Sequence, residues 1–193
     1  MAQRLDTSDY LSLFMNNTPM MDVRAPVEYA KGSFPNAVNC PLLDDAQRHA
    51  IGICYKKNGE KAAIQLGLDL ATPEIRTQRY AQWTSFCEQN PTGYLYCFRG
   101  GLRSRTTQQW LKEQGVQYPL VTGGYKAMRR FLLDQLEISI NKLNVVNIAG
   151  PTGSGKTRLL KHIKHHVDFE GLAHHRGSAF GRNPYDFQPT SID

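Results

Sequence analysis

Short apolar runs alternate with helical patterns along the first two thirds of the chain. Four runs are apolar on both faces and predict buried strands at 19–24, 37–40, 94–96 and 118–121. Helices are predicted at 6–16, 26–31, 44–67 with a break at 56–59, 72–88, 104–114 and from 125 to about 137. Strands that alternate with helices and lack a polar face are typical of a mostly parallel sheet covered by helices. We therefore predict an α/β fold.

The pattern restarts near the end of the chain. A connector is predicted at 138–143, and the apolar run 144–149 predicts a new buried strand. A glycine-rich turn follows, and a helix is predicted from there to about His166. These patterns predict one domain over residues 1–140 and the start of a second domain over residues 141–193.

Composition and charge narrow the class of protein. Of 193 residues, 40% are hydrophobic and 21% are charged, which is typical of a globular chain and not of a disordered, collagen-like or coiled-coil one. Lys and Arg number 23 against 17 acidic residues, and the net charge of +6 permits an anionic partner such as RNA. Because the chain lacks both an apolar run of roughly 18–20 residues and a signal-peptide pattern, we expect a cytoplasmic protein with no membrane partner.

The cysteines and histidines do not predict a metal site. The four cysteines include no Cys-x2-Cys pair, and free thiols are expected in a reducing cytosol. Cys40, Cys54 and Cys87 are predicted to be small buried hydrophobic residues. Three histidines between 162 and 166 alternate with lysines and predict a solvated basic helix face.

Cys97 is the candidate catalytic residue. It follows a predicted strand, and a glycine-containing loop leads from it to a predicted helix that begins near Ser104. Backbone N–H groups of such a loop can form an anion-binding nest, and the helix N-terminus adds partial positive charge. With the charge of Arg103, these features favour the thiolate and would hold an oxyanion or a chalcogen on the sulfur. The predicted anion cradle is Phe98, Arg99, Gly100, Gly101 and Leu102.

A second candidate site is the segment 150–157, which fits G-x4-G-K-[ST] between a predicted strand and a predicted helix. In this motif, backbone N–H groups surround a diphosphate, the lysine neutralises it and the hydroxyl can hold Mg²⁺. The pattern leaves the identity of the phosphate ligand open, with ATP or GTP as the generic choice. The predicted phosphate-binding residues are Gly150, Gly153, Ser154, Gly155, Lys156 and Thr157, the last being the candidate Mg²⁺ ligand.

The cysteine loop resembles the active-site loop of rhodanese-like domains. Segment 21–29 matches their Asp-Val-Arg…Glu-Tyr signature, in which we expect Asp22 and Arg24 to form a structural ion pair. Segment 32–39 resembles their Gly-His-Ile-Pro-Gly-Ala-x-Asn stretch, with Ser33 for the usual His and Asn36 for the usual Gly. The Cys-x5-Arg loop is one residue longer than the usual sulfurtransferase loop, and this length also occurs in dual-specificity phosphatases of the cell cycle.

A third segment makes the resemblance more specific. Residues 168–178 read Asp-Phe-Glu-Gly-Leu-Ala-His-His-Arg-Gly-Ser. A rhodanese-like segment, a P-loop and this segment, in that order, resemble the tRNA 2-selenouridine synthase family. That family's cysteine loop, Tyr-Cys-x-Arg-Gly-Gly-x-Arg-Ser, contains the same extra residue. The resemblance covers the chain from about Asp22 to its last residue.

The resemblance implies an enzyme that converts wobble 2-thiouridine in tRNA to 2-selenouridine, with selenophosphate as selenium donor. The implied route first S-geranylates the thiouridine from geranyl diphosphate, because an S-alkylated sulfur can leave as a thiol. Cys97 would carry the selenium as S-selanylcysteine in the cradle with Arg103, and segment 150–157 would bind the diphosphate. The implied partners are tRNA and an enzyme that supplies selenophosphate, and no tightly bound cofactor is implied.

Chain length leaves two hypotheses. A P-loop domain needs several strands after its first helix, and only 36 residues follow Thr157. The first hypothesis is therefore a truncated selenium transferase that retains only the first β-P-loop-α unit of its second domain. The alternative is a stand-alone rhodanese-like sulfurtransferase, or a Cys-x5-Arg phosphatase-like module, with a disordered tail.

Overall fold

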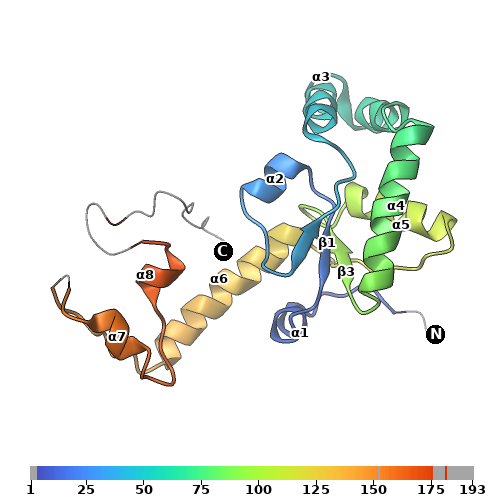
Figure 1. Cartoon of the computed structure of the whole chain (residues 1–193). Coiled ribbons are helices and arrows are strands. Elements are labelled where there is room, and N and C mark those ends of the chain that lie inside the picture. Colours follow the sequence, from blue (N-terminus) through green and yellow to red (C-terminus); the bar gives the residue numbers. More distant parts are fainter. Residues whose placement is uncertain (1–3, 152, 176–180, 182–193) are drawn as a thin grey trace. The chain divides into compact units, whose positions relative to one another are not determined.

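A parallel three-stranded sheet organises the first part of the chain (Figure 1). The computed structural model of the protein describes residues 4–151, 153–175 and 181. The strands are β1 (Met20–Asp22), β2 (Ala37–Asn39) and β3 (Tyr94–Tyr96), in the order β2-β1-β3. Both pairs are parallel, with Met21 of the central strand beside Val38 and Leu95. The predicted α/β fold with a parallel sheet is confirmed.

The fourth predicted strand, at 118–121, is reduced to isolated bridges. Leu120 pairs with Leu95 of β3, and Val121 pairs with Thr7 near the N-terminus. The backbone bonds of this segment are nevertheless made, because Val121 N–H donates to the Leu95 carbonyl at 2.8 Å and Leu95 N–H donates to the Pro119 carbonyl at 3.0 Å. The segment therefore extends the sheet beside β3 without forming a regular strand.

Helices surround the sheet (Figure 1). They are α1 (Tyr10–Met15), α2 (Pro26–Ala30), α3 (Asp45–Asp69), α4 (Pro73–Gln89), α5 (Leu102–Glu113) and α6 (Gly124–Lys142). The starts of the two longest helices before α6 follow from local sequence: Asp44 caps α3 by accepting from the Gln47 N–H at 2.8 Å, and Thr72 caps α4 ahead of Pro73. Gly59, with φ of 83°, kinks α3 where the sequence predicts a break.

The strands bury both of their faces. Met21, Val23 and Leu95 belong to one core cluster, which α4 and α5 complete with Trp83 and Trp110. Alternate strand residues point the other way, since successive side chains of a strand face opposite sides. On that second face, the ring of Phe34 packs against the rings of Tyr96, Phe14 of α1 and Tyr125 of α6. Burial on two faces explains the apolar strand sequences.

The chain divides into two compact units, Met1–Asp134 and Gln135–Asp193, so the division falls inside α6. The connector predicted at 138–143 is wrong, because α6 continues to Lys142. The strand predicted at 144–149 is also wrong, since this segment is irregular and Val145 and Val146 are 69% and 86% exposed. Within the described residues of this unit, no strand offers the neighbour that a strand needs for pairing.

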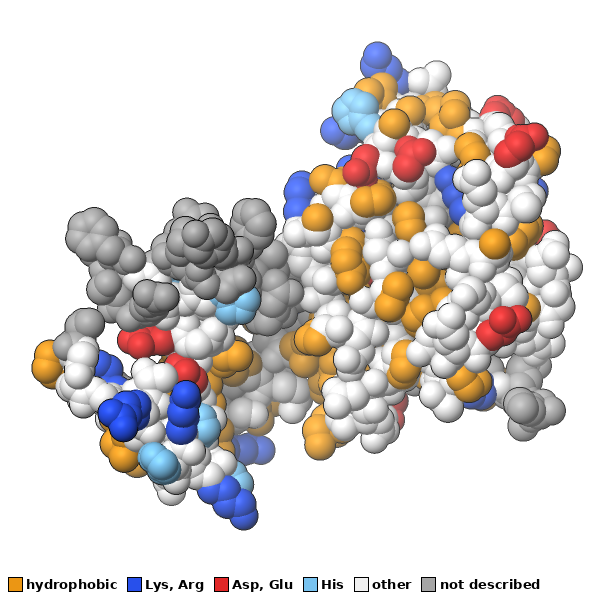
Figure 2. Space-filling model, viewed as in Figure 1, with side chains coloured by type: hydrophobic (Ala, Val, Ile, Leu, Met, Phe, Trp, Pro, Cys, Tyr) orange, Lys and Arg blue, Asp and Glu red, His pale blue; other side chains and the backbone are white. Residues whose placement is uncertain are grey.

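After the end of α6, the described residues of the second unit form two short helices, α7 (Lys156–Leu160) and α8 (Phe169–Leu172). The helix predicted to reach His166 ends at Leu160, so the histidines at 162–166 do not share a helix face. Lys, Arg and His side chains gather over the part of this unit around α7 (Figure 2). No helix in the described ranges is long and apolar enough to cross a membrane.

Candidate sulfur-carrier site

Cys97 lies directly after β3, at the carboxyl edge of the parallel sheet, where ligand sites of open α/β sheets are found. Its carbonyl accepts from the Tyr125 N–H at 2.9 Å, and the carbonyl of Phe98 accepts from the Lys126 N–H at 2.9 Å. Both donors belong to the first turn of α6. The loop that begins at Cys97 is therefore attached to β3 at one end and to α6 along its side.

Glycines allow this attachment. Gly100 and Gly124 adopt φ of 64° and 58°, which residues with a Cβ rarely adopt. A Cβ on Gly124 would collide with the Cys97 carbonyl oxygen, and one on Gly100 would lie 2.6 Å from the Gly123 nitrogen. The cysteine loop and the turn before α6 thus pack backbone against backbone.

The Cys97 sulfur is enclosed, with 3% of the residue exposed. Its Sγ lies 2.9 Å from the hydroxyl of Ser104, which also reaches the Gly101 carbonyl at 3.3 Å. When the sulfur carries a proton it can donate to the hydroxyl, and the hydroxyl can donate to the carbonyl. When the sulfur is a thiolate, the hydroxyl can rotate and donate to it. The Ser104 hydroxyl can therefore hydrogen-bond the sulfur in either charge state.

The backbone N–H groups that follow Cys97 are available as donors. In the part of the chain that the structure describes, no acceptor is found for the N–H groups from Phe98 to Ser104. The last of these belong to the first turn of α5, where N–H groups lack helical partners and carry partial positive charge. The loop therefore presents donors that can hydrogen-bond an anion near the sulfur, which is the role that the sequence predicts for it.

Arg103 makes an ion pair that the sequence reasoning did not assign. Its guanidinium donates to both carboxylate oxygens of Glu28 in α2, at 2.5 and 3.2 Å. Arg48 of α3 contacts the same carboxylate at 3.1 Å. Burial would raise the pKa of Glu28, but hydrogen bonding and charge from Arg103, with a smaller effect of Arg48, hold this pKa below its usual range. The Glu28 charge thus partly offsets the positive charge that Arg103 brings to the loop.

Asp22 and Arg24 form the ion pair that the sequence predicts. Arg24 Nη2 lies 2.6 Å from Asp22 Oδ2, and both side chains are almost fully buried. The guanidinium also donates to the Gly32 carbonyl at 2.9 Å and lies 3.8 Å from the centre of the Tyr125 ring. The pair therefore connects the end of β1 to the turn after α2 and to α6, without touching the Cys97 sulfur in any contact that the structure records.

The segment 150–157 has a different environment. Gly153 and Gly155 adopt φ of 82° and 81°, and Gly155 precedes the first residue of α7. Lys156 Nζ donates to the carbonyls of Gly150 and Pro151 at 2.8 and 3.0 Å. Thr157 is exposed on the first turn of α7, and Thr152 lies outside the described residues.

The remaining predicted phosphate ligand, Ser154, lies within the segment 150–157, and the third motif follows this segment along the chain. Ser154 is exposed, and its N–H donates to the Pro151 carbonyl at 3.2 Å. In the third motif, Asp168 caps α8 by accepting from the Gly171 N–H at 3.0 Å, whereas residues 176–178 lie outside the described residues. Among the residues that the structure describes, no three His, Cys, Asp or Glu side chains gather as a metal site.

The comparisons with known proteins agree with the two halves of this description. The rhodanese-like domain family matches residues 6–130. The chain belongs to the rhodanese-like family. Residues 143–193 match the AAA domain of tRNA 2-selenouridine synthase, which places the start of that domain after the rhodanese-like one.

The similarity of this rhodanese-like chain to known relatives extends across both of its parts. The tRNA 2-selenouridine synthases of Marinobacter nauticus and Alcanivorax borkumensis are each 57% identical to it, over 100% and 98% of this chain and 52% of each relative. That of Pseudomonas syringae pv. syringae is 52% identical over 97% of this chain and 51% of its own length. The chain is thus a homologue of tRNA 2-selenouridine synthases, and it spans about half the length of the curated relatives it matches.

A solved structure supports the fold of the rhodanese-like part. It is the N-terminal domain of a Clostridium difficile 630 protein described as ATP/GTP-binding, with 31% identity and a TM-score of 0.59. The match covers 66% of this chain and 98% of that domain.

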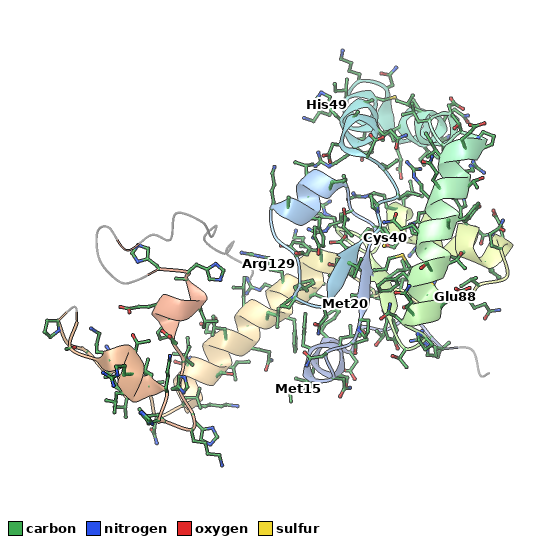
Figure 3. The ribbon with its side chains drawn as sticks, viewed as in Figure 1. Met15, Met20, Cys40, His49, Glu88 and Arg129 are labelled. Atoms are coloured by element: carbon green, nitrogen blue, oxygen red, sulfur yellow. The ribbon has the colours of Figure 1, made fainter. Side chains whose placement is uncertain are left out.

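Two of the other cysteines of this rhodanese-like chain have raised pKa values. Burial, and next the charge of Asp22, raises the pKa of Cys40 to about 12, and burial raises that of Cys87 to about 12, so both remain neutral thiols. Cys40 lies at the end of β2, on the side of α4 (Figure 3), and its carbonyl accepts from Trp83 Nε1 at 3.0 Å. The prediction of burial is wrong for Cys54, which is only partly buried on α3.

Three contributors to the site were absent from the sequence-based set: Ser104, Glu28 and Arg48. Ser104 could have been found, because it ends the Tyr-Cys-x-Arg-Gly-Gly-x-Arg-Ser motif and one helical turn returns it to the loop. Glu28 belongs to the Glu-Tyr end of the 21–29 signature, but the signature does not show which cation it pairs with. Arg48 carries no local signal, because its contact with Glu28 depends on how α3 packs beside α2.

Proposed function

We propose that this chain carries the selenium-relay half of a tRNA 2-selenouridine synthase, with Cys97 as the residue that holds the selenium as S-selanylcysteine. The observation that supports this most is the enclosed Cys97 sulfur, which contacts Ser104 and precedes a run of backbone N–H groups that find no acceptor among the described residues. Such donors stabilise an anionic chalcogen on the sulfur, and enclosure keeps water away from it.

The substrates follow from the names of the relatives and from the chemistry of the two loops. Selenophosphate is the proposed donor, and its anionic oxygens suit the cradle of N–H groups with Arg103. Wobble 2-thiouridine in tRNA is the proposed acceptor, and a selenophosphate-producing enzyme is the proposed supplier. The reaction would take place in the cytoplasm, where a reducing environment keeps the relay thiol free.

The segment 150–157 is the proposed site for the diphosphate of geranyl diphosphate. Positive φ at Gly153 and Gly155 can bring successive N–H groups toward an anion, and Lys156 must exchange its two carbonyl acceptors for phosphate oxygens. The exposed Thr157 hydroxyl suits Mg²⁺, which in phosphate sites keeps mainly water and phosphate oxygens as ligands. Bound there, Mg²⁺ would supply charge for the diphosphate leaving group.

Loading of Cys97 is the direct test. The chain is first treated with thiosulfate, from which the Cys97 thiolate takes the outer sulfur as a persulfide while sulfite leaves. Selenophosphate is then added; its hydrolysis releases selenide and phosphate, and selenide displaces the outer sulfur of the persulfide as hydrogen sulfide. The mass added to each cysteine peptide is measured under non-reducing conditions. We expect selenium on Cys97, loss of loading in Cys97→Ser, and normal loading in the matched control Cys54→Ser, which changes a partly exposed cysteine outside the site.

The same samples separate the alternatives. Thiosulfate–cyanide transfer without selenium loading would favour a stand-alone sulfurtransferase. Hydrolysis of an aryl phosphate that depends on Cys97 would favour the phosphatase-like module. Loading of Cys54 in place of Cys97 would contradict the assignment of the relay cysteine.

A further inference from the structure

A polar groove borders the cysteine loop on the outer side of α5. Its volume is about 650 Å³, within the range of ligand-binding clefts. It is lined by the N-terminal segment, by α5 and by residues of 117–122, and Gly100 of the cysteine loop also lines it. All of these residues belong to the first unit. Apart from Gly100, the residues that line this groove have no part in the proposed relay chemistry.

Positive charge dominates the groove. Arg4, Arg105 and Lys112 line it, against the single carboxylate of Asp6. That carboxylate already accepts from Gln108 Nε2 and from the Leu120 N–H, each at 2.9 Å. The groove therefore keeps a net charge of about +2, and its one acidic group is held in the structure by neutral donors.

Two of the three cations are free to bind a ligand. Arg105 and Lys112 are exposed, and the structure records no hydrogen bond or ion pair for either side chain among the residues it describes. Arg4 donates to the carbonyls of Thr92 and Gly93, at 2.8 and 2.9 Å, and no acidic partner of its charge is recorded in the described part of the chain. Unpaired cations on a surface favour an anionic partner.

The spacing of these cations fits a chain of phosphates better than one phosphate. Arg105 and Lys112 are seven residues apart on α5, which places them on the same face about 10 Å apart along the helix axis. At that separation, the two side chains can contact different phosphates of one nucleic-acid strand. Amide side chains of Gln109 and Gln117, both exposed in the groove, can hydrogen-bond ribose hydroxyls.

We propose that this groove binds the phosphate backbone of the substrate RNA, next to the stretch that enters the Cys97 loop. This inference rests on the proposed function for the identity of the RNA as tRNA. Because Gly100 lines the groove and belongs to the cysteine loop, backbone contacts at Arg105 and Lys112 hold the RNA beside the loop. Phosphate contacts of this kind position a nucleic acid without reading its sequence.

The test measures RNA affinity with a matched change of charge. The double variant Arg105→Ala/Lys112→Ala is compared with Lys56→Ala/Lys57→Ala, which removes two exposed lysines from α3, away from the groove lining. The probe is an anticodon stem-loop RNA with 2-thiouridine at the wobble position, and binding is measured by fluorescence anisotropy at several salt concentrations. Circular dichroism melting of each variant establishes that the fold is retained.

We expect the groove variant to bind about tenfold more weakly at low salt. Its plot of log K against log salt concentration should be shallower by about 1.4, for two lost contacts with single-stranded RNA. The Lys56→Ala/Lys57→Ala control should stay within about twofold of wild type.

Several outcomes would overturn the proposal. Equal weakening of both variants would mean attraction by net charge alone, and absence of RNA binding by the wild-type chain would remove the site. Inorganic phosphate or a mononucleotide is also tested as a competitor. If it displaces the RNA completely, and if the groove variant no longer binds it, the groove would be assigned to a small phosphorylated ligand. Selenium loading of wild-type Cys97 is measured in parallel and tests the relay function by itself. A failure of the groove proposal can therefore be told apart from a failure of the proposed relay function.

Discussion

The loop after Cys97 and the loop from Gly150 to Thr157 are both glycine-containing segments that lead into a helix, but they differ in what holds them. The first follows β3, is bonded to the first turn of α6 and encloses its reactive atom. The second follows an irregular, exposed segment, and among the residues that the structure describes its lysine bonds to carbonyls of its own loop. A motif therefore fixes which donors are present, whereas packing against other elements fixes where they point.

The core explains this difference. Cys97 belongs to the cluster that joins the strands to α4 and α5, so the position of the sulfur is stabilised by burial of large apolar side chains. Around the second loop, Val145, Val146 and Leu159 remain more than half exposed. The position of the first loop is thus stabilised by the packing of the core of the first unit, whereas the second loop is stabilised by local hydrogen bonds.

The largest expected effect is that variants of the two loops lose different reaction steps. In the Marinobacter nauticus relative, the equivalent of Cys97→Ser should still form geranylated thiouridine but no selenouridine, because serine cannot form a sulfur–selenium bond. The equivalent of Lys156→Ala should stop the geranylation step, because the diphosphate loses its neutralising charge. Mass spectrometry of nucleosides from the modified tRNA measures both products. Loss of selenation alone in the lysine variant would contradict the assignment of the second loop.

The second effect concerns the glycines of the two loops. Gly124→Ala should destabilise the first unit by about 3–5 kcal/mol, because strain at positive φ adds to a collision with the Cys97 carbonyl. Gly153→Ala adds only the strain, since apart from its chain neighbours no described residue has an atom within 4 Å of the added Cβ, and it should leave the unfolding of the first unit unchanged. Urea denaturation followed by tryptophan fluorescence reports on this unit through Trp83 and Trp110.

A helical glycine provides the control for that pair. Gly52→Ala lies in α3, where the added Cβ meets no described atom within 4 Å apart from its chain neighbours and the backbone of its own helix, and alanine favours a helix over glycine by roughly 0.5–1 kcal/mol. A similar loss of stability in Gly52→Ala and Gly124→Ala would show that the backbone contact between the two turns is not what the glycine preserves.

The third effect is a pH dependence at Glu28. Because its folded pKa lies below the ordinary value, the Glu28 charge stabilises the fold above roughly pH 4.3, and this stabilisation is lost as the pH falls through the folded pKa. Glu28→Gln should therefore cost about 1–2 kcal/mol at pH 7 and almost nothing once wild-type Glu28 is protonated. Urea denaturation from pH 7 to pH 3 gives the two curves. A difference between Glu28→Gln and wild type that stayed the same from pH 7 to pH 3 would contradict this charge-dependent role of Glu28.

The sequence predicted the sheet and the candidate cysteine because their signals are local. Apolar runs mark β1, β2 and β3, and the strand, the glycines and the helix around Cys97 are contiguous. The pairing of Arg103 with Glu28 joins residues 75 positions apart and could not be read from the loop itself. The strand expected at 144–149 was wrong for a related reason: an apolar run becomes a strand only where a neighbouring strand completes its hydrogen bonds.

The smallest expected effect is on the stability contributed by Lys156. Its ammonium donates to carbonyls of two exposed residues, Gly150 and Pro151, which water can hydrogen-bond equally well when the side chain is removed. Lys156→Ala should therefore change the free energy of unfolding by less than about 0.5 kcal/mol. Arg24→Ala is the contrasting variant, because it leaves the buried Asp22 charge unpaired and should cost about 3–5 kcal/mol. Urea denaturation of both variants at pH 7 gives the comparison. A loss above about 1 kcal/mol in Lys156→Ala would mean that the second loop is held as firmly as the first, and the contrast between them would then have to be given up.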